Sequence, residues 1–230
     1  MLHTRPRTSL IQRLSLSIWG LFLALLLLLS ALGFLAMRMA ADRIVPMVAR
    51  HTVELRANAS EGLFVQAEQS VLRLQQELIR RLSQADHSAT LARFDALFAR
   101  STDGLWRLRP ELVDAERAPT LYLHQPPQGL GDSARLRAVV AYDLLREQGP
   151  ALAPPFFSVY MDFVEDGLMV YARGVDWGNG ADATATNTGY PTMQGSEPRR
   201  NPQRKVFWTP VYFDKPAAPW MVSVIKPLDW

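Results

Sequence analysis

Aromatic and charged residues alternate along two apolar segments in the second half of the chain. Trp208, Tyr212 and Asp214 lie an even number of residues apart, and so do Tyr171 and Arg173. Side chains two positions apart share one face of a β-strand, so each set would present rings and a charge on one side. Small-ligand sites combine apolar walls with a few polar groups. We therefore expect these five residues to line a ligand-binding pocket.

The two charges would recognise different groups on a ligand. Asp214 beside aromatic rings suits an amine or another cation, whereas Arg173 suits an anionic group. Tyr160 and Asp162 repeat the same alternation in an earlier segment. In the alternative interpretation, the rings belong to the hydrophobic core and the charges lie at its rim.

The sequence contains no recognisable catalytic or metal-binding pattern. There is no cysteine, which excludes disulfides, thiolate metal sites and a cysteine nucleophile. The four histidines are dispersed along the chain, at His3, His51, His87 and His124. Gly178-Asn179-Gly180 lacks the glycine and lysine that would make it a phosphate-binding loop. We expect no catalytic residues, no cofactor and no metal in this chain.

The elements that must position the pocket residues are predicted to be mostly β. Residues 156–163 and 168–171 read as a hairpin with Asp166-Gly167 in its turn. Two further strands are predicted at 206–214 and 220–225. The intervening stretch 174–204 is rich in Gly, Asn, Thr and Pro, and loops of this length usually carry function or a short helix.

Between the N-terminal region and this β-rich part, helices and strands alternate. Helices are predicted from Ser88 to about Arg100 and from Asp132 or Ser133 to Arg146. Short strands are predicted at 105–108 and 120–124. The predicted fold class is therefore α+β, with an antiparallel sheet flanked by helices.

An uncharged apolar run, 18–37, is the strongest signal in the sequence. Twenty apolar residues in a helix span about 30 Å, the thickness of a bilayer core. The preceding tail, 1–17, is purely basic, which places the N-terminus in the cytoplasm and the remainder outside. A signal peptide cleaved after Ala31-Leu32-Gly33 is the alternative, but the run continues beyond that point. We expect a retained membrane anchor.

The region 38–86 is predicted to be a long extracytoplasmic stalk helix. Its apolar residues recur at steps of three and four, namely Leu55, Ala59, Leu63, Ala67, Val71, Leu74, Leu78 and Leu82. This stripe would pack on the following domain, 87–230. A homodimer formed through the stalk is a second interpretation of the same stripe.

The positive net charge does not indicate a nucleic-acid partner. Three of the 25 basic residues, Arg5, Arg7 and Arg13, belong to the tail, and the other 22 are balanced by 22 acidic residues. The high isoelectric point thus reflects a short basic tail and not a basic binding face. The expected partners are a lipid bilayer and a small molecule.

The chain resembles double-Cache sensor domains, the extracytoplasmic ligand sensors of bacterial diguanylate cyclases, histidine kinases and chemoreceptors. The resemblance rests on the membrane and stalk helices, on RFDALFARSTDGLWRLRPE, and above all on NPQRKVFWTPVYFDKPAAPWMVSVIKPL. It implies a PAS-like sheet with its pocket in the membrane-distal module, 87–230, and an anchor in a bacterial inner membrane. It also implies that the chain ends before the proximal module, the return helix and the output domain.

Within that resemblance, Tyr212 and Asp214 correspond to the last Tyr and Asp of amino-acid-binding members. The Arg-x-Trp-Tyr run of those members is missing, which argues against an amino-acid ligand. Three classes of function remain: a sensing receptor with a cytoplasmic output enzyme, a membrane-anchored binding protein without output, and a secreted binding protein. The first is the function we expect.

Overall fold

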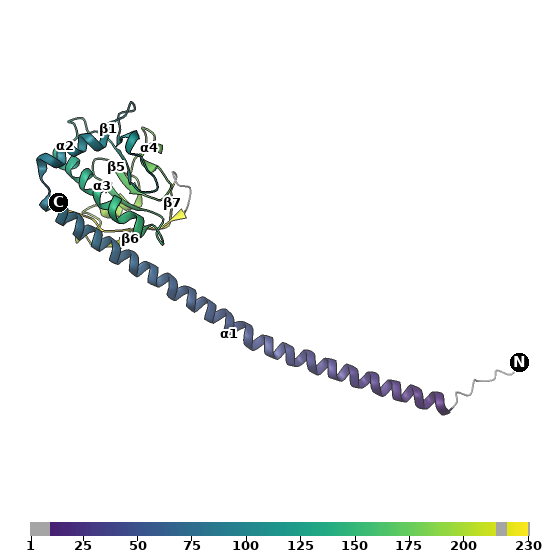
Figure 1. Cartoon of the computed structure of the whole chain (residues 1–230). Helices are drawn as coiled ribbons and strands as arrows, with labels where there is room; N and C mark the ends of the chain where they lie inside the picture. Colours follow the sequence, from purple (N-terminus) through teal and green to yellow (C-terminus); the bar gives the residue numbers. More distant parts are fainter. Residues whose placement is uncertain (1–9, 215–219, 230) are drawn as a thin grey trace. The chain divides into compact units, whose positions relative to one another are not determined.

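The computed structural model describes residues 10–214 and 220–229 (Figure 1). It divides into two compact units, one ending at Glu61 and one beginning at Gly62. A single helix, α1 (Leu10–Gln84), runs through the first unit and into the second, where the sequence suggested a span followed by a separate stalk.

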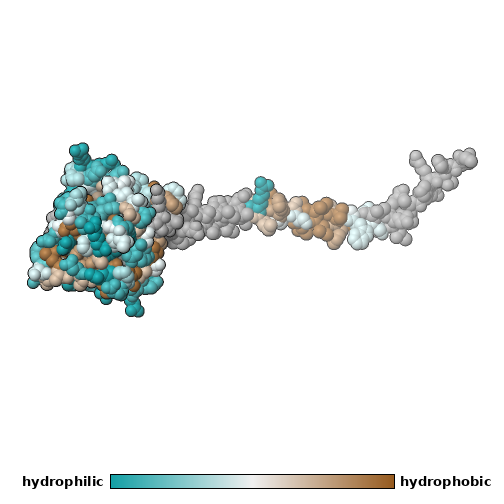
Figure 2. Space-filling model, turned by 90° about the horizontal axis from the view of Figure 1, so that it is seen from above, coloured by the Kyte–Doolittle hydropathy of each residue, from teal (hydrophilic) through white to brown (hydrophobic). Residues whose placement is uncertain are grey.

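The N-terminal part of α1 is long and apolar enough to cross a membrane. This segment, Ser17–Met39, has a mean hydropathy of 2.5 and buries none of its side chains within the protein. Figure 2 shows it as a brown band of hydrophobic residues. An exposed helix of this composition is unfavourable in water, because each apolar side chain would be hydrated. A membrane-spanning segment near the N-terminus is therefore consistent with the structure.

The second unit is built on a five-stranded antiparallel sheet in the order β1-β2-β3-β5-β4. Its strands are β1 (Phe98–Arg100), β2 (Trp106–Leu108), β3 (Thr120–Leu123), β4 (Val159–Phe163) and β5 (Gly167–Tyr171). The last two form the predicted hairpin, in which Phe163 pairs with Gly167 across the turn. The expected mixed fold, an antiparallel sheet flanked by helices, is confirmed.

Helices cover one face of this sheet. They are the end of α1, α2 (His87–Leu97) and α3 (Asp132–Leu152). The Asp86 side chain caps α2 by accepting a hydrogen bond from the Ala89 backbone N–H. The main hydrophobic core lies between sheet and helices and includes Leu82, Phe94, Val139, Leu121 and Met169. This core fixes the sheet on which the site described below is built.

The opposite face of the sheet is covered by the segment that follows β5. This segment contains α4 (Trp177–Gly180) and α5 (Pro191–Ser196). The Gly178 N–H donates to Thr120 Oγ1 at 2.9 Å, which joins α4 to β3. The Arg107 guanidinium donates to the carbonyl oxygens of Gly178 and Ala181. The stretch 174–204, expected to carry function or a short helix, thus contains two short helices and is held against the sheet by hydrogen bonds.

Two helix ends differ from the sequence expectation. The helix expected to reach Arg100 ends at Leu97, because residues 98–100 pair with β2 as an edge strand. Helix α3 continues past Gly149-Pro150 to Leu152. A side chain at Gly149 would strike the ring of Tyr171, with a Cβ contact of 2.7 Å, so this glycine permits close helix–sheet packing.

The two C-terminal strands are interrupted instead of continuous. Strand β6 (Phe207–Trp208) pairs with β9 (Val224–Ile225), and β7 (Tyr212–Phe213) pairs with β8 (Trp220–Met221). Pro210 lies at the break and has no N–H for a ladder hydrogen bond. The interruption changes which side chains share a face, with consequences for the predicted site.

Candidate functional site

Tyrosine and aspartate side chains gather on the sheet face opposite α3. In the strand register, Tyr122 and Asp162 both pair with Leu168, and Tyr160 pairs with Val170. Residues paired in this way point to the same face of the sheet. The covering segment adds further side chains of the same kind. The resulting tyrosine–aspartate cluster comprises Tyr122, Tyr160, Asp162, Tyr190, Tyr212 and Asp214.

The hydroxyl groups of the cluster form a short polar chain. Tyr212 Oη lies 2.9 Å from Ser223 Oγ, and the Ser223 N–H donates to Thr209 Oγ1 at 3.0 Å. The Tyr160 hydroxyl is buried beside those of Tyr212 and Ser223, yet it makes no hydrogen bond of ordinary geometry with the described residues. A buried hydroxyl without a partner is costly, so this atom marks a place where a ligand or water would bind.

Asp162 carries a negative charge into the cluster. Its Oδ1 accepts a hydrogen bond from Asn187 Nδ2 at 3.2 Å, and the Thr192 hydroxyl is a second neutral partner. Among the described residues, none of the ion pairs includes Asp162. Burial raises the pKa of this carboxyl from 3.8 to about 6, because the neutral donors offset only part of the lost hydration.

Asn187 links the covering segment to the β4–β5 hairpin. It is almost fully buried, its Nδ2 donates to the Gly167 carbonyl at 2.7 Å, and its N–H donates to Asp166 Oδ1 at 2.8 Å. Its own Oδ1 has no partner among the described residues. The Asn187 side chain thus contacts Asp162 through Nδ2, while its Oδ1 is a second buried polar atom of the site without a hydrogen bond among the described residues.

Two of the five predicted pocket residues belong to this cluster. Tyr212 packs edge-to-face on Tyr190, with ring centroids 6.0 Å apart. Asp214 is nearly buried and, together with Asp162, raises the pKa of Tyr212, although burial of that hydroxyl is the larger cause. Tyr212 and Asp214 thus lie near the tyrosines of the sheet face opposite α3.

The Trp208 side chain contacts α1 and not the tyrosine–aspartate cluster. Its Nε1 donates to Glu68 Oε1 at 2.7 Å, and its ring lies edge-to-face with Phe64 at 4.7 Å, both on α1. The prediction placed Trp208 and Tyr212 on one face by counting along a continuous strand. The break at Pro210 removes that continuity, and the two side chains separate.

Tyr171 and Arg173 lie on the α3 side of the sheet, so the expectation that they share a cavity with Tyr212 and Asp214 is wrong. Tyr171 is fully buried in the main core, where its hydroxyl donates to the Glu116 carbonyl at 2.8 Å. Arg173 reaches the Pro150 carbonyl at 3.4 Å. Pairing of Tyr160 with Val170 places the next residue, Tyr171, on the opposite face.

Tyr122 and Tyr190 were not anticipated. Tyr122 alternates with Leu121 and Leu123, so period-two counting in the predicted strand 120–124 could have found it. Burial and the charges of Asp162 and other neighbours raise its pKa well above the ordinary tyrosine value. Tyr190 sits just before α5, where no sequence periodicity exists to reveal its direction.

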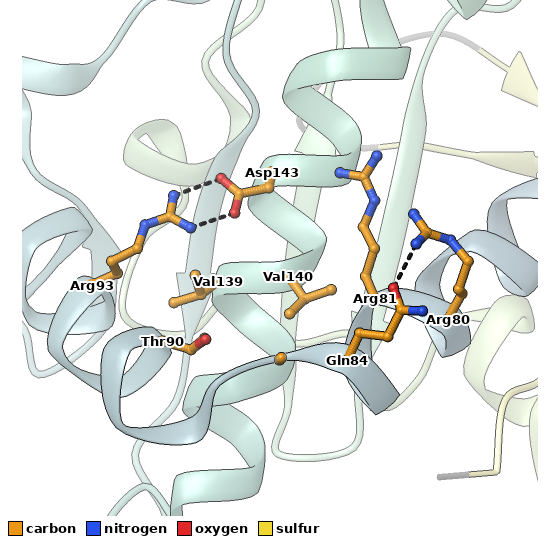
Figure 3. Close-up of a pocket in the computed structure, with 9 residues that line it drawn as sticks. Arg80, Arg81, Gln84, Thr90, Arg93, Val139, Val140 and Asp143 are labelled. Atoms are coloured by element: carbon orange, nitrogen blue, oxygen red, sulfur yellow. Dashed lines mark hydrogen bonds and ion pairs between the residues drawn. The ribbon is translucent and has the colours of Figure 1, made fainter.

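A separate concavity of about 330 Å³ lies between α1, α2 and α3 (Figure 3). Three arginines line it, but each already has an ionic partner. Arg93 binds Asp143 through two hydrogen bonds of 2.6 and 2.7 Å. Arg80 and Arg81 both bind Glu77. An anion would have to displace these carboxylates. We therefore interpret this concavity as a junction of helices that ion pairs hold together, and not as an anion-binding site.

Within the part of the chain that the structure describes, no group of three or more His, Cys, Asp or Glu side chains is arranged to hold a metal ion. Comparison with known proteins found no matching family model, no matching curated protein and no matching solved structure. The functional argument therefore rests on the tyrosine–aspartate cluster and on α1.

Proposed function

We propose that this chain is the extracytoplasmic small-ligand sensing module of a membrane-bound signal-transduction receptor. The module would control a cytoplasmic output domain, a diguanylate cyclase or histidine kinase, that lies outside this sequence. The observation that carries the proposal is the polar site under the cover of the sheet, where, among the described residues, Asp162 has only neutral hydrogen-bond partners and Tyr160 Oη has none. Such unsatisfied groups reduce stability and are typical of binding sites.

Helix α1 connects that module directly to the candidate membrane span, because the same helix contains the span and ends in the module. Leu78 and Leu82, near its C-terminal end, are buried in the main core. Glu68 and Phe64 of the same helix contact Trp208, which precedes the strand carrying Tyr212. A ligand that repositions the β6–β9 region would alter these contacts with α1. We propose that this is how binding changes the state of the membrane helix, by a shift between two arrangements.

The proposed topology gives a first prediction. A dual reporter fused after Asp214, with one half active only outside the cytoplasm and the other only inside, should report an outside location. The basic tail at Arg5, Arg7 and Arg13 is the physical reason, because positive flanks remain in the cytoplasm. Activity of the cytoplasmic half would refute an extracytoplasmic sensor. A mature protein beginning near Phe34 would instead favour the secreted binding protein.

A second apolar stripe on α1 supports the proposed homodimer. Val65, Leu72 and Ile79 are spaced by seven residues and remain 47, 38 and 38% exposed, whereas Ala67, Leu78 and Leu82 face the domain. A strict seven-residue spacing keeps one side of a helix facing a supercoiled partner. Two copies anchored by the same N-terminal helix would be parallel. We propose that Val65, Leu72 and Ile79 meet their counterparts in a second copy.

The absence of cysteine makes this dimer easy to test. Oxidation of a Leu72→Cys variant in membranes should give a disulfide-linked dimer, since equivalent seam positions face each other. The control is Arg73→Cys, whose side chain lies one position farther round the helix and points away from the seam. Equal cross-linking of both variants, or of neither, would contradict pairing through this stripe.

A further inference from the structure

We infer that the tyrosine–aspartate cluster recognises a small ammonium cation, with Asp162 holding its charge and Tyr160 and Asn187 accepting its other hydrogen bonds. This inference rests on the proposed function only in assuming that a small molecule binds in the cluster. It differs from the sequence-based expectation because the anionic group is on β4 and the predicted anion-binding Arg173 is on the other face of the sheet.

The available acceptors match the donors of an ammonium group. An alkylammonium has three N–H donors and no acceptor. In the part of the chain that the structure describes, Asp162 accepts hydrogen bonds from neutral groups only, and the buried atoms Asn187 Oδ1 and Tyr160 Oη have no partner. These groups are neighbours: Asn187 Nδ2 contacts Asp162, and Tyr160 precedes Asp162 by two residues on the same strand face. The three acceptors thus belong to neighbouring side chains of β4 and the covering segment.

The surroundings favour a cation and oppose an anion. Tyr122 on β3 and Tyr212 on β7 lie near enough to Asp162 for its charge to act on their hydroxyl groups, and the Tyr190 ring packs on that of Tyr212. Aromatic faces attract ammonium groups. Asp166 and Asp214 add negative charge near Tyr122. A carboxylate or phosphate ligand would be repelled by the Asp162 charge, which takes part in none of the ion pairs among the described residues.

Protonation of Asp162 should weaken binding. The titratable groups around it are Tyr160 on its own strand, Tyr122 on β3, Tyr190 before α5, Tyr212 on β7, and the carboxyls Asp166 and Asp214. The tyrosines are neutral in this range, since the ordinary tyrosine pKa is 10.0 and burial raises it further for Tyr122 and Tyr190. The pKa of Asp162 is raised to about 6, so affinity for an amine should fall by up to about tenfold for each pH unit below that value.

The test uses the full chain in detergent micelles and a matched set of probes. The probes share two carbon skeletons and differ in the head group. They are the cations propylamine and benzylamine, the corresponding neutral alcohols, and the corresponding anionic carboxylates. Calorimetric titration at pH 7.5 should detect binding of an amine in preference to its alcohol and carboxylate. Asp162→Asn should weaken that binding at least tenfold. The control Asp95→Asn makes the same charge change on an exposed residue of α2 and should have no effect.

The outcomes separate this inference from the proposed function. Binding of the alcohols or carboxylates that survives Asp162→Asn would overturn ammonium recognition and leave a sensor of another ligand class. If Asp95→Asn weakened amine binding as much as Asp162→Asn does, the cause would be the net surface charge. That result would also overturn ammonium recognition by Asp162. Failure of every amine to bind would overturn the inference. The extracytoplasmic location of the proposed sensor is tested independently, by the dual reporter fused after Asp214.

Discussion

Asp162→Asn is expected to stabilise the unliganded protein above pH 6. The raised pKa of about 6, against 3.8 for an ordinary aspartate, means that the folded state binds a proton more tightly than the unfolded state. Stability should therefore fall as pH rises from about 4 to 6 and stay low above that range. A difference of two pKa units corresponds to about 2.7 kcal/mol, and partial exposure reduces the expected gain to about 1–2 kcal/mol.

Asparagine can keep the local hydrogen bonds, since its oxygen accepts from Asn187 and its amide donates to Thr192. The measurement is urea unfolding of the full chain in micelles at pH 4 and pH 8, for the parent, Asp162→Asn and Asp95→Asn. Only Asp162→Asn should gain stability, and only at pH 8. Destabilisation of that variant at pH 8 would show that the charge has a favourable structural role.

Gly178→Ala is expected to destabilise the protein by about 2–3 kcal/mol and to loosen the cover of the site. A Cβ at this position would lie 2.4 Å from the Leu121 nitrogen and 2.7 Å from its carbonyl carbon and oxygen. These are backbone atoms of the central strand β3, which cannot move aside without breaking the sheet. The hydrogen bond from the Gly178 N–H to Thr120 would be strained by the same shift.

Gly180→Ala is the matched control, because it adds the same methyl group to the same short helix. A Cβ there would have no neighbour within 4 Å. Alanine has the better helix propensity, so this variant should be neutral or slightly stabilised. Thermal unfolding and proteolysis within 174–204 compare the two. Equal stability of both variants would show that α4 does not pack on β3 as described.

Much of the fold could be predicted because its signals are local. The Asp166-Gly167 turn fixed the β4–β5 hairpin, and in the described structure Phe163 pairs with Gly167 directly across it. The apolar repeat in α1 predicted a helix whose Leu78 and Leu82 reach the core. The positions of these elements follow from periods of two and 3.6 residues, which need no knowledge of the rest of the chain.

The site was harder to predict because it depends on which strand face each residue joins. Alternation indicated that Tyr160 and Asp162 share a face, but not that Tyr171 lies on the other one; that follows only from the pairing of Tyr160 with Val170. Trp208 was separated from Tyr212 by the interruption at Pro210. The two loop residues Asn187 and Tyr190 reach the cluster through tertiary packing, which has no periodic signature.

The central claim is that the tyrosine–aspartate cluster binds a small ligand. The most direct measurement is thermal unfolding of the full chain in micelles against a broad set of small metabolites. A ligand at 100 times its dissociation constant adds about 2.7 kcal/mol, which for a protein of this size raises the midpoint by roughly 5–10 °C. We predict such a rise for at least one compound, its loss in Asp162→Asn combined with Tyr160→Phe, and its retention in Arg93→Gln in the α1–α3 concavity. The absence of any stabilising compound, or a rise lost only in Arg93→Gln, would contradict the account.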